Sequence, residues 1–324
     1  MELAFCYPQP EAYRFARQLG GRLGYIDFCW PTIQPEPGVF DFSEYDPIVA
    51  ECAATGMELI GAVSSVRVIC PDGRWVFADS RGMMPDPAAW ARYLTALVER
   101  YKATVRYWEV WSEPNCTACN PMSYYDPRLY REVLKLGGAA IRAADPTAKI
   151  VLGGLWFNNY TLSYTKTLLA GGPADDLFDI FSFHFFLMTP VRAAAPFSVW
   201  QEPLSRWVDF FRRQLARDCP IWITEFGLPT SKPGHDLVYS VTLGDIIGLS
   251  EAEQADWFSA FVEAAEKDWD IGVVTWICLQ DKANQSGRNS FNDNLGLLRV
   301  DGSAKAVKER VVEFMTQKTR LQLR

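Results

Sequence analysis

The segment VRYWEVWSEPN, residues 105–115, joins a run of strand-forming apolar residues to an abrupt stop at Glu113 and Pro114. A near-continuous apolar run is typical of a parallel strand that is covered on both faces. A carboxylate placed just beyond such a run lies where the strand leaves the sheet. The segment therefore predicts a buried parallel strand that presents Glu113 at its C-terminal end.

Seven further apolar runs of this kind alternate with helical patterns along the chain. The eight predicted strands are residues 3–7, 23–28, 57–63, 105–111, 149–154, 179–185, 220–226 and 271–277. Helix starts are marked between them, for example by Asp86 followed by Pro87 and by the capping box of Ser250 with Glu253. Eight alternations in 324 residues predict a (β/α)8 TIM barrel of the α/β class.

No linker-like or low-complexity segment interrupts the alternation, so we expect residues 1–324 to form a single domain with a frayed tail at 316–324. A doubly wound sheet is the alternative, but the residues after the first strand, YPQPEAY, lack its usual glycine-rich turn. Long segments follow strands, whereas connections from helix back to strand are short. In a barrel this asymmetry builds one elaborate face, where catalytic residues are found.

Composition excludes several classes of function. A formal net charge of -7 argues against nucleic acid, because phosphate binding needs clustered Lys and Arg. No apolar run approaches the roughly 18 residues of a membrane span. The N-terminus, MELAFCYPQP, resembles a first strand more than a secretory signal, so we expect a cytoplasmic protein or a trimmed secreted one. The sequence does not indicate an oligomeric state.

Cysteines and histidines are too sparse for most metal sites and nucleophile triads. Cys116 and Cys119 have CxxC spacing, but a zinc site would need a second pair or nearby histidines. The whole chain holds only His184 and His235. We therefore expect the two cysteines to form a local disulfide or to remain free thiols, and we expect neither a metal nor another cofactor.

Two glutamates form the strongest candidate site. Glu113 follows the fourth predicted strand, and Glu225 ends the seventh in the segment PIWITEF. Strands of a barrel end on one rim, so the two carboxyl groups are expected to face each other there. Glycosidic bond cleavage needs such a pair, one protonated to assist the leaving oxygen and one ionised to attack the anomeric carbon. Taken singly, either residue could instead cap a backbone amide or pair with an arginine.

These segments resemble the glycoside hydrolases of clan A, which are retaining (β/α)8 enzymes. WEVWSEPN and WITEFG are similar to the clan's acid/base and nucleophile motifs, and nearly the whole chain follows the pattern. Family 39 is the most similar, with families 5 and 42 as neighbours. The resemblance implies a retaining β-glycosidase of oligo- or polysaccharides, with Glu113 as general acid/base and Glu225 as nucleophile. It implies carboxyl groups roughly 5–5.5 Å apart.

The resemblance also implies residues that contact the carbohydrate. Trp276 matches the tryptophan that floors the sugar subsite, since an indole suits the apolar face of a pyranose; barrel packing is its alternative. His184 matches a histidine that hydrogen-bonds substrate or a neighbouring carboxylate, with a core role as the alternative. Further substrate-binding positions are expected at Trp30, Trp111, Ser112, Asn115 and Trp156.

Three positions depart from the clan pattern. Ser112 replaces an asparagine, Phe186 replaces a tyrosine, and Tyr25 replaces an arginine for which Arg22 is a shifted candidate. Each loss would weaken transition-state stabilisation by about 3 kcal/mol. The departures keep two rival hypotheses open. One is a carbohydrate-binding barrel without turnover, and the other is a barrel enzyme that uses Glu113 and Glu225 as metal ligands.

Overall fold

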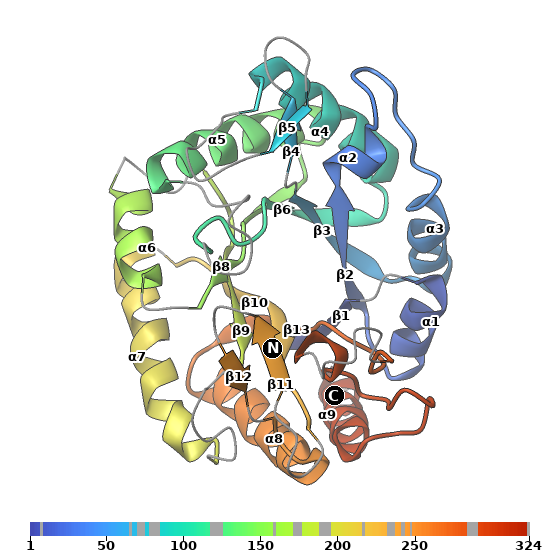
Figure 1. Ribbon diagram of the computed structural model, residues 1–324, viewed down its shortest axis with the longest axis vertical. Helices are drawn as coiled ribbons and strands as arrows, with labels where there is room; N and C mark the ends of the chain where they lie inside the picture. Colours follow the sequence, from blue (N-terminus) through green and yellow to red (C-terminus); the bar gives the residue numbers. More distant parts are fainter. Residues whose placement is uncertain are drawn as a thin grey trace.

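A nine-stranded parallel sheet winds into a barrel, and helices cover its outside (Figure 1). The computed structural model describes residues 1–6, 9–64, 67–69, 75–77, 85–116, 126–157, 160–170, 177–187, 196–215, 218–231, 237–240, 244–246, 248–283 and 291–322. In spatial order the strands are β7 (Lys149–Leu152), β6 (Val105–Val110), β3 (Glu58–Ser64), β2 (Leu23–Cys29), β1 (Glu2–Cys6), β13 (Ile271–Trp276), β10 (Ile221–Gly227), β9 (Phe181–Phe186) and β8 (Leu155–Trp156). The predicted TIM barrel is confirmed.

All eight predicted strands are present, and the fifth is divided into two pieces. Gly153 and Gly154 separate β7, which pairs with β6, from β8, which pairs with β9. The barrel closes at this division through a parallel bridge between Val151 and Ile180. The Leu152 amide donates to the Ile180 carbonyl at 2.9 Å and strengthens the closure.

The outer layer follows the helix signals of the sequence. Its helices are α1 (Pro10–Gln18), α3 (Asp46–Thr55), α4 (Pro87–Tyr101), α5 (Pro127–Ala144), α6 (Thr161–Leu169), α7 (Ser198–Leu215), α8 (Glu251–Lys267) and α9 (Ala306–Gln322), with the short α2 (Trp30–Ile33) and η1 (Phe291–Asp293). Asp86 caps α4 by accepting from the Ala89 amide at 2.7 Å, and Ser250 with Glu253 forms the capping box of α8. Residues 316–322 continue α9, so the tail expected to fray from 316 is helical there.

The barrel interior holds an apolar cluster and several buried polar side chains. The cluster contains Ala4, Leu23, Tyr25, Ile60, Val151, Trp222 and Val273. Glu109, Ser182 and His184 are also buried. Tyr25 connects the two sets, because its hydroxyl donates to Glu109 Oε1 at 3.0 Å.

Two antiparallel strand pairs lie in the long segments after β3 and β10. They are β4 (Arg67–Ile69) with β5 (Trp75–Phe77), and β11 (Leu237–Ser240) with β12 (Gly244–Ile246). Both pairs follow the C-terminal ends of barrel strands, as the segment lengths predicted. None of the helices in the described part of the chain combines the length and apolarity that a bilayer-spanning segment needs.

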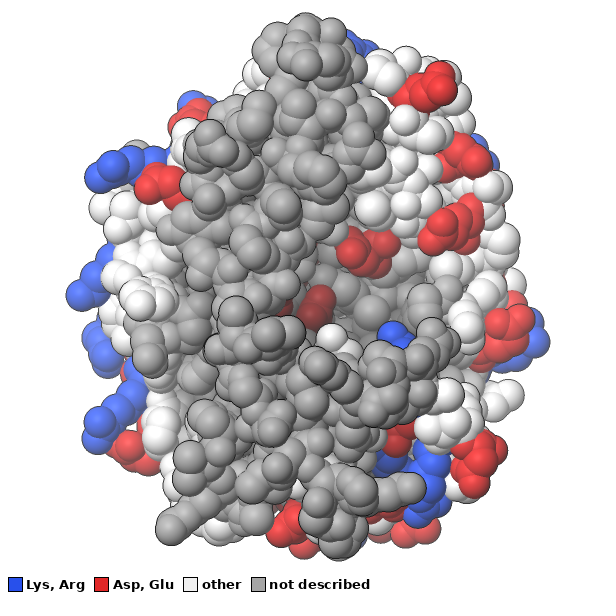
Figure 2. Space-filling view, in the orientation of Figure 1, with Lys and Arg blue, Asp and Glu red and all other residues white. Residues whose placement is uncertain are grey.

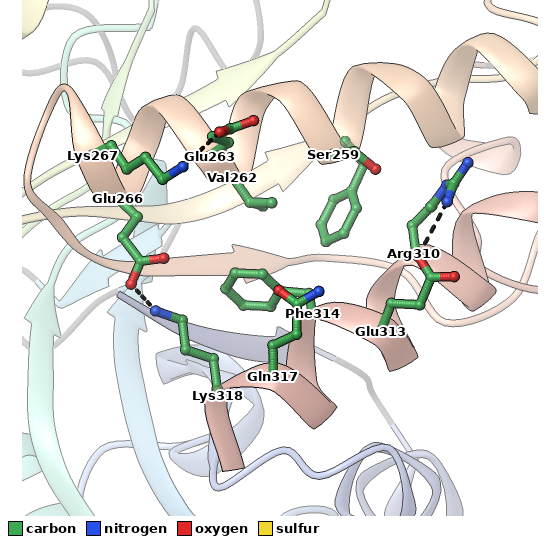
Figure 3. Close-up of a pocket in the computed structure, with 11 residues that line it drawn as sticks. Ser259, Val262, Glu263, Glu266, Lys267, Arg310, Glu313, Phe314, Gln317 and Lys318 are labelled. Carbon is green, nitrogen blue, oxygen red and sulfur yellow. Dashed lines mark hydrogen bonds and ion pairs between the residues drawn. The ribbon is translucent and has the colours of Figure 1, made fainter. Parts of the chain in front are cut away.

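Outside the barrel, α8 and α9 leave a shallow hollow between them (Figure 3). Phe258 and Phe314 line it, with an edge-on arrangement at 6.4 Å between ring centroids. Charged side chains at its edges pair with one another, as Lys267 does with Glu263 at 2.7 Å. The hollow lies at the contact between α8 and α9, and none of the predicted site residues line it.

Candidate active site

A strained turn carries Glu113 beyond the end of β6. The backbone angle φ is 73° at Trp111 and 49° at Glu113. Such left-handed values cost residues with a Cβ roughly 1–3 kcal/mol each and cluster at functional sites. Backbone hydrogen bonds hold the turn: the Trp111 amide donates to Val63 at 2.8 Å, and the Glu113 amide donates to Gly154 at 3.1 Å.

Asn115 fastens this turn to β8. Its Nδ2 donates to the Trp156 carbonyl at 2.9 Å and to Thr161 Oγ1 at 3.1 Å, and its Oδ1 accepts from the Trp156 amide at 2.7 Å. The side chain is buried. Its amide is thus engaged within the protein, so the structure gives Asn115 a supporting position instead of the predicted sugar contact.

Glu225 reaches the same rim through a bulge in β10. The pairing with β9 shifts register between Ile223 and Glu225, and the pairing with β13 shifts between Ile223 and Phe226. In a regular strand, Glu225 would point away from the face that Thr224 occupies. A bulge inserts an extra residue and re-aims a side chain, which is common beside active sites. Here it turns Glu225 inward, while Phe226 packs outward on Phe261 with ring centroids 4.3 Å apart.

His184 of β9 lies between the two glutamates. Its Nδ1 is 2.9 Å from Glu113 Oε1 and 3.5 Å from Glu225 Oε2. One nitrogen of the ring and one oxygen of each carboxyl group all lie within 4.8 Å of one another. The imidazole is fully buried, whereas the side chains of Glu113 and Glu225 are 16% and 23% exposed. The structure therefore brings these three predicted residues together.

The carboxyl groups open onto the C-terminal face of the barrel. Figure 2 shows acidic side chains in and beside a hollow near the middle of this face. Asp27, near the end of β2, belongs to the same acidic set, and its Oδ1 accepts from Ser64 Oγ at 2.7 Å. Sequence reasoning missed Asp27, although a lone carboxylate within an apolar strand was a signal that could have found it.

The cluster retains protons at neutral pH. Burial raises the pKa of Glu225 to about 8; His184 opposes this rise, while Glu113 and Glu109 add to it. Burial alone would lower the pKa of His184, but the carboxylates of Glu225, Glu109 and Glu113 outweigh it and hold that pKa well above its ordinary value. A carboxyl pair that keeps one proton near pH 7 can supply both an acid and a base.

Two predicted sugar-binding tryptophans lie in the helix layer. Trp30 and Trp111 are both fully buried, and each packs against Trp90 of α4, with ring centroids 5.0 and 5.9 Å apart. Trp30 Nε1 also donates to Gln34 Oε1 at 2.7 Å. Their rings support the strand ends from outside, so the structure does not bring them to the carboxyl groups.

Trp276 also points into the helix layer. Its ring is fully buried and lies 5.6 Å from the rings of both Phe226 and Phe258, and its Nε1 donates to the Leu295 carbonyl at 3.0 Å. Side chains alternate along a strand, so the inward position beside it falls to Thr275. The structure thus matches the packing alternative for Trp276 and not the sugar platform that the resemblance implied.

Other predicted positions lie closer to the carboxyl pair. Ser112 is partly exposed in the turn that carries Glu113. Trp156 pairs with His184 in the ladder of β8 and β9, and its ring stacks on Phe186 with centroids 5.6 Å apart. The substitution of phenylalanine for the clan's tyrosine therefore contributes an apolar wall beside the site.

The missing second-strand arginine is not replaced by Arg22. Arg22 precedes β2 and lies at the opposite end of the barrel, beside Glu2 and Glu58. Tyr25 occupies the interior instead, and its hydroxyl donates to Glu109 Oε1 at 3.0 Å. Sequence reasoning missed Glu109, although a charged residue in the middle of the strand YWEVW was the available signal.

None of the described cysteines lies close enough to His184 to share a metal-binding cluster with it. Cys116 is disulfide-bonded, whereas its CxxC neighbour Cys119 and the second histidine, His235, lie outside the described residues. Glu113, His184 and Glu225 present atoms that one cation could contact. A cation there would have to replace the 2.9 Å hydrogen bond between His184 and Glu113. The observed arrangement is that of a hydrogen-bonded acid cluster.

Comparison with known proteins agrees with this geometry. The family model described as cellulase, glycosyl hydrolase family 5, matches residues 26–318. An endo-1,4-beta-xylanase 1 of Gibberella zeae is 28% identical over 151 residues, which is 44% of this chain and 38% of the xylanase. The chain thus matches less than half the length of that relative.

Solved structures share the fold at low sequence identity. A family 39 glycoside hydrolase from Bacteroides cellulosilyticus WH2 superposes with a TM-score of 0.71 at 18% identity, over 97% of this chain and 63% of that one. A family 5 enzyme from Bifidobacterium longum subsp. longum, in complex with Manb1-4GlcNAc, gives a TM-score of 0.70 at 15% identity, over 98% of this chain and 78% of that one. The chain therefore belongs to the cellulase family, glycosyl hydrolase family 5.

Proposed function

We propose that the protein is a retaining β-glycoside hydrolase that cleaves β-linked oligo- or polysaccharides by double displacement. One observation carries the proposal: an oxygen of Glu113 and an oxygen of Glu225 lie within 4.8 Å of each other on one rim. Retaining enzymes hold their carboxyl groups about 5–5.5 Å apart, whereas inverting enzymes leave roughly 6.5–9.5 Å for a water molecule. The short separation supports direct attack by one carboxylate.

In the proposed reaction, Glu225 attacks the anomeric carbon while Glu113 protonates the departing glycosidic oxygen. The bond between the anomeric carbon and that oxygen breaks, and a glycosyl-enzyme ester forms on Glu225. Glu113, now ionised, then takes a proton from water, which displaces Glu225 from the sugar. One water is consumed, and both carboxyl groups return to their starting states.

The proton has to reside on Glu113 when the bond breaks. In the unliganded protein, burial favours the protonated form of Glu225 and raises its pKa to about 8. A bound sugar places developing positive charge against Glu225, which favours its ionised form. His184 contacts both carboxyl groups through Nδ1, so the proton has a short route to Glu113.

Two features support a neutral β-linked substrate. The curated relatives are endo-1,4-beta-xylanases, whose names specify a β-1,4-linked chain. The rim carries an exposed carboxyl group on Asp27 and partly exposed ones on Glu113 and Glu225, and these would repel the carboxylate of an acidic sugar. We propose that neutral glycosides are preferred over uronates.

The experiment that tests the reaction is covalent trapping. An aryl β-glycoside panel of xylosides, glucosides, mannosides, galactosides, glucuronides and 2-amino sugars first identifies a substrate. The 2-fluoro analogue of that sugar should then glycosylate Glu225, and peptide mass spectrometry would identify the labelled residue. Label on any other residue would refute the role assignment. The 2-amino sugars test Ser112, which replaces the asparagine that usually binds the sugar 2-hydroxyl.

The two rival hypotheses give different results in the same assay. A carbohydrate-binding barrel without turnover would bind glycans and leave every chromogenic substrate intact. A metal-dependent enzyme would lose activity with a chelator and regain it when divalent ions are restored. The proposed glycosidase cleaves at least one β-glycoside and is indifferent to the chelator.

A further inference from the structure

A third carboxylate lies directly beneath the two that form the proposed catalytic pair. Glu109, on β6, is fully buried. Its Oε1 accepts from the Tyr25 hydroxyl at 3.0 Å, and its Oε2 accepts from Ser182 Oγ at 3.2 Å. Both donors are neutral. A buried carboxylate with neutral partners alone is unfavourable, so Glu109 needs a cation nearby.

His184 is the cationic partner that the structure offers. Among the described residues, the ion pairs of Glu109, Glu113 and Glu225 are all with His184. The ring nitrogen Nε2 faces Glu109 Oε1 at 3.7 Å, a charge contact longer than a hydrogen bond. The other nitrogen, Nδ1, faces the catalytic pair. One imidazole therefore stands between a buried carboxylate below and two reacting carboxyl groups above.

The position of the ring is fixed by Gly154 at the division of the fifth strand. A Cβ atom built on Gly154 would lie 1.9 Å from His184 Nε2 and 2.2 Å from Cδ2. The imidazole edge thus lies against bare backbone. The Gly154 carbonyl also accepts from the Glu113 amide. One backbone segment therefore fixes the positions of both the His184 ring and the turn that carries Glu113.

We propose that Glu109 is a positioning residue of the site: together with Tyr25 and Ser182, it holds the His184 ring as a buried cation under the catalytic pair. Among the described residues, this cation is the one that pairs with all three glutamates. It donates from Nδ1 to Glu113, faces Glu225 at 3.5 Å, and lowers the cost of placing two carboxylates side by side.

The charges around His184 all favour this state. Glu109 and Glu113 face it from β6 and Glu225 faces it from β10, with Asp27 and the neutral Tyr25 on β2. No described lysine or arginine pairs with any of these three glutamates. The raised pKa of His184 agrees with the geometry. The catalytic consequence rests on the proposed function, but the charge state of the ring does not.

Histidine NMR tests the inference directly, because the chain has only two histidines. With ¹⁵N-labelled imidazoles and His235→Gln to assign the signals, we expect both ring nitrogens of His184 to be protonated near pH 7. In Glu109→Gln, which removes the charge and keeps the shape, the titration midpoint of His184 should fall by about one to three pH units. Glu109→Asp should largely restore it.

Glu58→Gln is the matched control, since it removes a carboxylate from the opposite end of the neighbouring strand β3. It should leave the His184 titration unchanged. A neutral His184 ring near pH 7 in the unmodified protein would overturn the inference, and that measurement does not depend on any variant folding. A midpoint that stays fixed in a folded Glu109→Gln variant would overturn it as well.

The activity assay separates this inference from the proposed function. If Glu225 is the nucleophile, the alkaline limb of the kcat/KM profile should move to lower pH in Glu109→Gln, because His184 then loses its proton earlier. A merely structural role for Glu109 would lower activity at every pH without moving the limb, and would refute the inference. If no glycoside is cleaved, the NMR result still decides whether His184 is a cation.

Discussion

Glu113 and Glu225 reach one point on the rim by opposite means. Glu113 lies beyond its strand, on a left-handed turn held by backbone bonds to Val63 and Gly154. Glu225 lies within its strand, where a bulge in β10 turns it inward between two flanking ladders. The comparison teaches that a barrel can present two like carboxyl groups on supports of different backbone geometry. Glu113, the proposed acid, lies on a strained turn, and Glu225, the proposed nucleophile, lies within a paired strand.

The largest expected difference between the two glutamates is in activity. Glu225→Ala should abolish turnover of every glycoside, because no ester can form without the nucleophile. Glu113→Ala should lower turnover of substrates with poor leaving groups by about 10²–10⁴-fold, since only proton transfer is lost. Aryl glycosides with acidic phenols need little protonation and should still form the glycosyl-enzyme in Glu113→Ala.

Steady-state kinetics on two aryl glycosides, one with an acidic and one with a weakly acidic phenol, would measure this difference. Azide should restore turnover to Glu113→Ala and yield a β-glycosyl azide, since the anion needs no base. Equal losses on both substrates in Glu113→Ala would contradict the assignment of Glu113 as the acid.

Gly154→Ala should displace the His184 ring, which both glutamates contact. The new methyl group would lie 1.9 Å from His184 Nε2, so the ring has to move away from both glutamates. We expect kcat/KM to fall by about 10²-fold, as misplacement by an ångström can cause. Gly138→Ala in α5 is the control, because its nearest contact would be an ordinary 3.5 Å and alanine favours a helix. Retained activity in Gly154→Ala would show that the ring position does not matter.

Asn115→Ala should destabilise the turn that carries Glu113 and leave β10 unaffected. The substitution leaves the Trp156 amide without its Asn115 partner, and an unpaired buried donor costs about 1–3 kcal/mol. Urea denaturation should report this loss in the free energy of unfolding. Ser163→Ala in α6, whose exposed hydroxyl bonds to the Tyr160 carbonyl, is the control and should change it little. Trapping by the 2-fluoro sugar should persist in Asn115→Ala, because β10 is unaffected.

The last comparison concerns the dependence of stability on pH. Glu225 has a pKa near 8 when folded and an ordinary value near 4.5 when unfolded, so the folded chain binds more protons between these values. Its contribution to stability is therefore full below pH 4.5 and is lost as the pH rises through 8. His184, whose pKa is also raised, changes stability in the same direction.

Urea denaturation at several pH values from about 5 to 9 would measure this decline. Glu225→Gln does not titrate, so the decline should be shallower in that variant. Glu263→Gln, at an exposed position on α8, is the control and should keep the slope of the unmodified protein. A Glu225→Gln variant with an unchanged slope would contradict the raised pKa.

The barrel could be predicted from sequence because its signals are local. Apolar runs mark all eight strands, and the caps at Asp86 and Ser250 mark two helix starts. The end of α9 was missed because the basic segment KTRLQLR was interpreted as a tail, whereas it continues a helix to Gln322. The division of the fifth strand was missed as well, since Gly153 and Gly154 also fit a strand end.

The site was predicted in part. Glu113, His184 and Glu225 follow from strand ends on one rim, and they are brought together. Side-chain direction could not be obtained in this way, because the turn at Glu113 and the bulge at Glu225 override simple alternation. Trp276 is the example of a position where alternation holds: β13 pairs regularly with β1 from Val273 to Trp276, and the ring packs outward among the helices.

The division of the fifth strand has a mechanical consequence. The ordered sheet ends at β7 on one side and at β8 on the other, and the barrel closes through a bridge from Val151 of β7 to Ile180, the residue before β9. Backbone amides beside this seam should exchange with deuterium sooner than those of β2 and β3, which pair along seven residues. Local opening of the barrel would then begin at Gly154, which contacts His184. Opening at this point would expose the buried imidazolium to water at the same time.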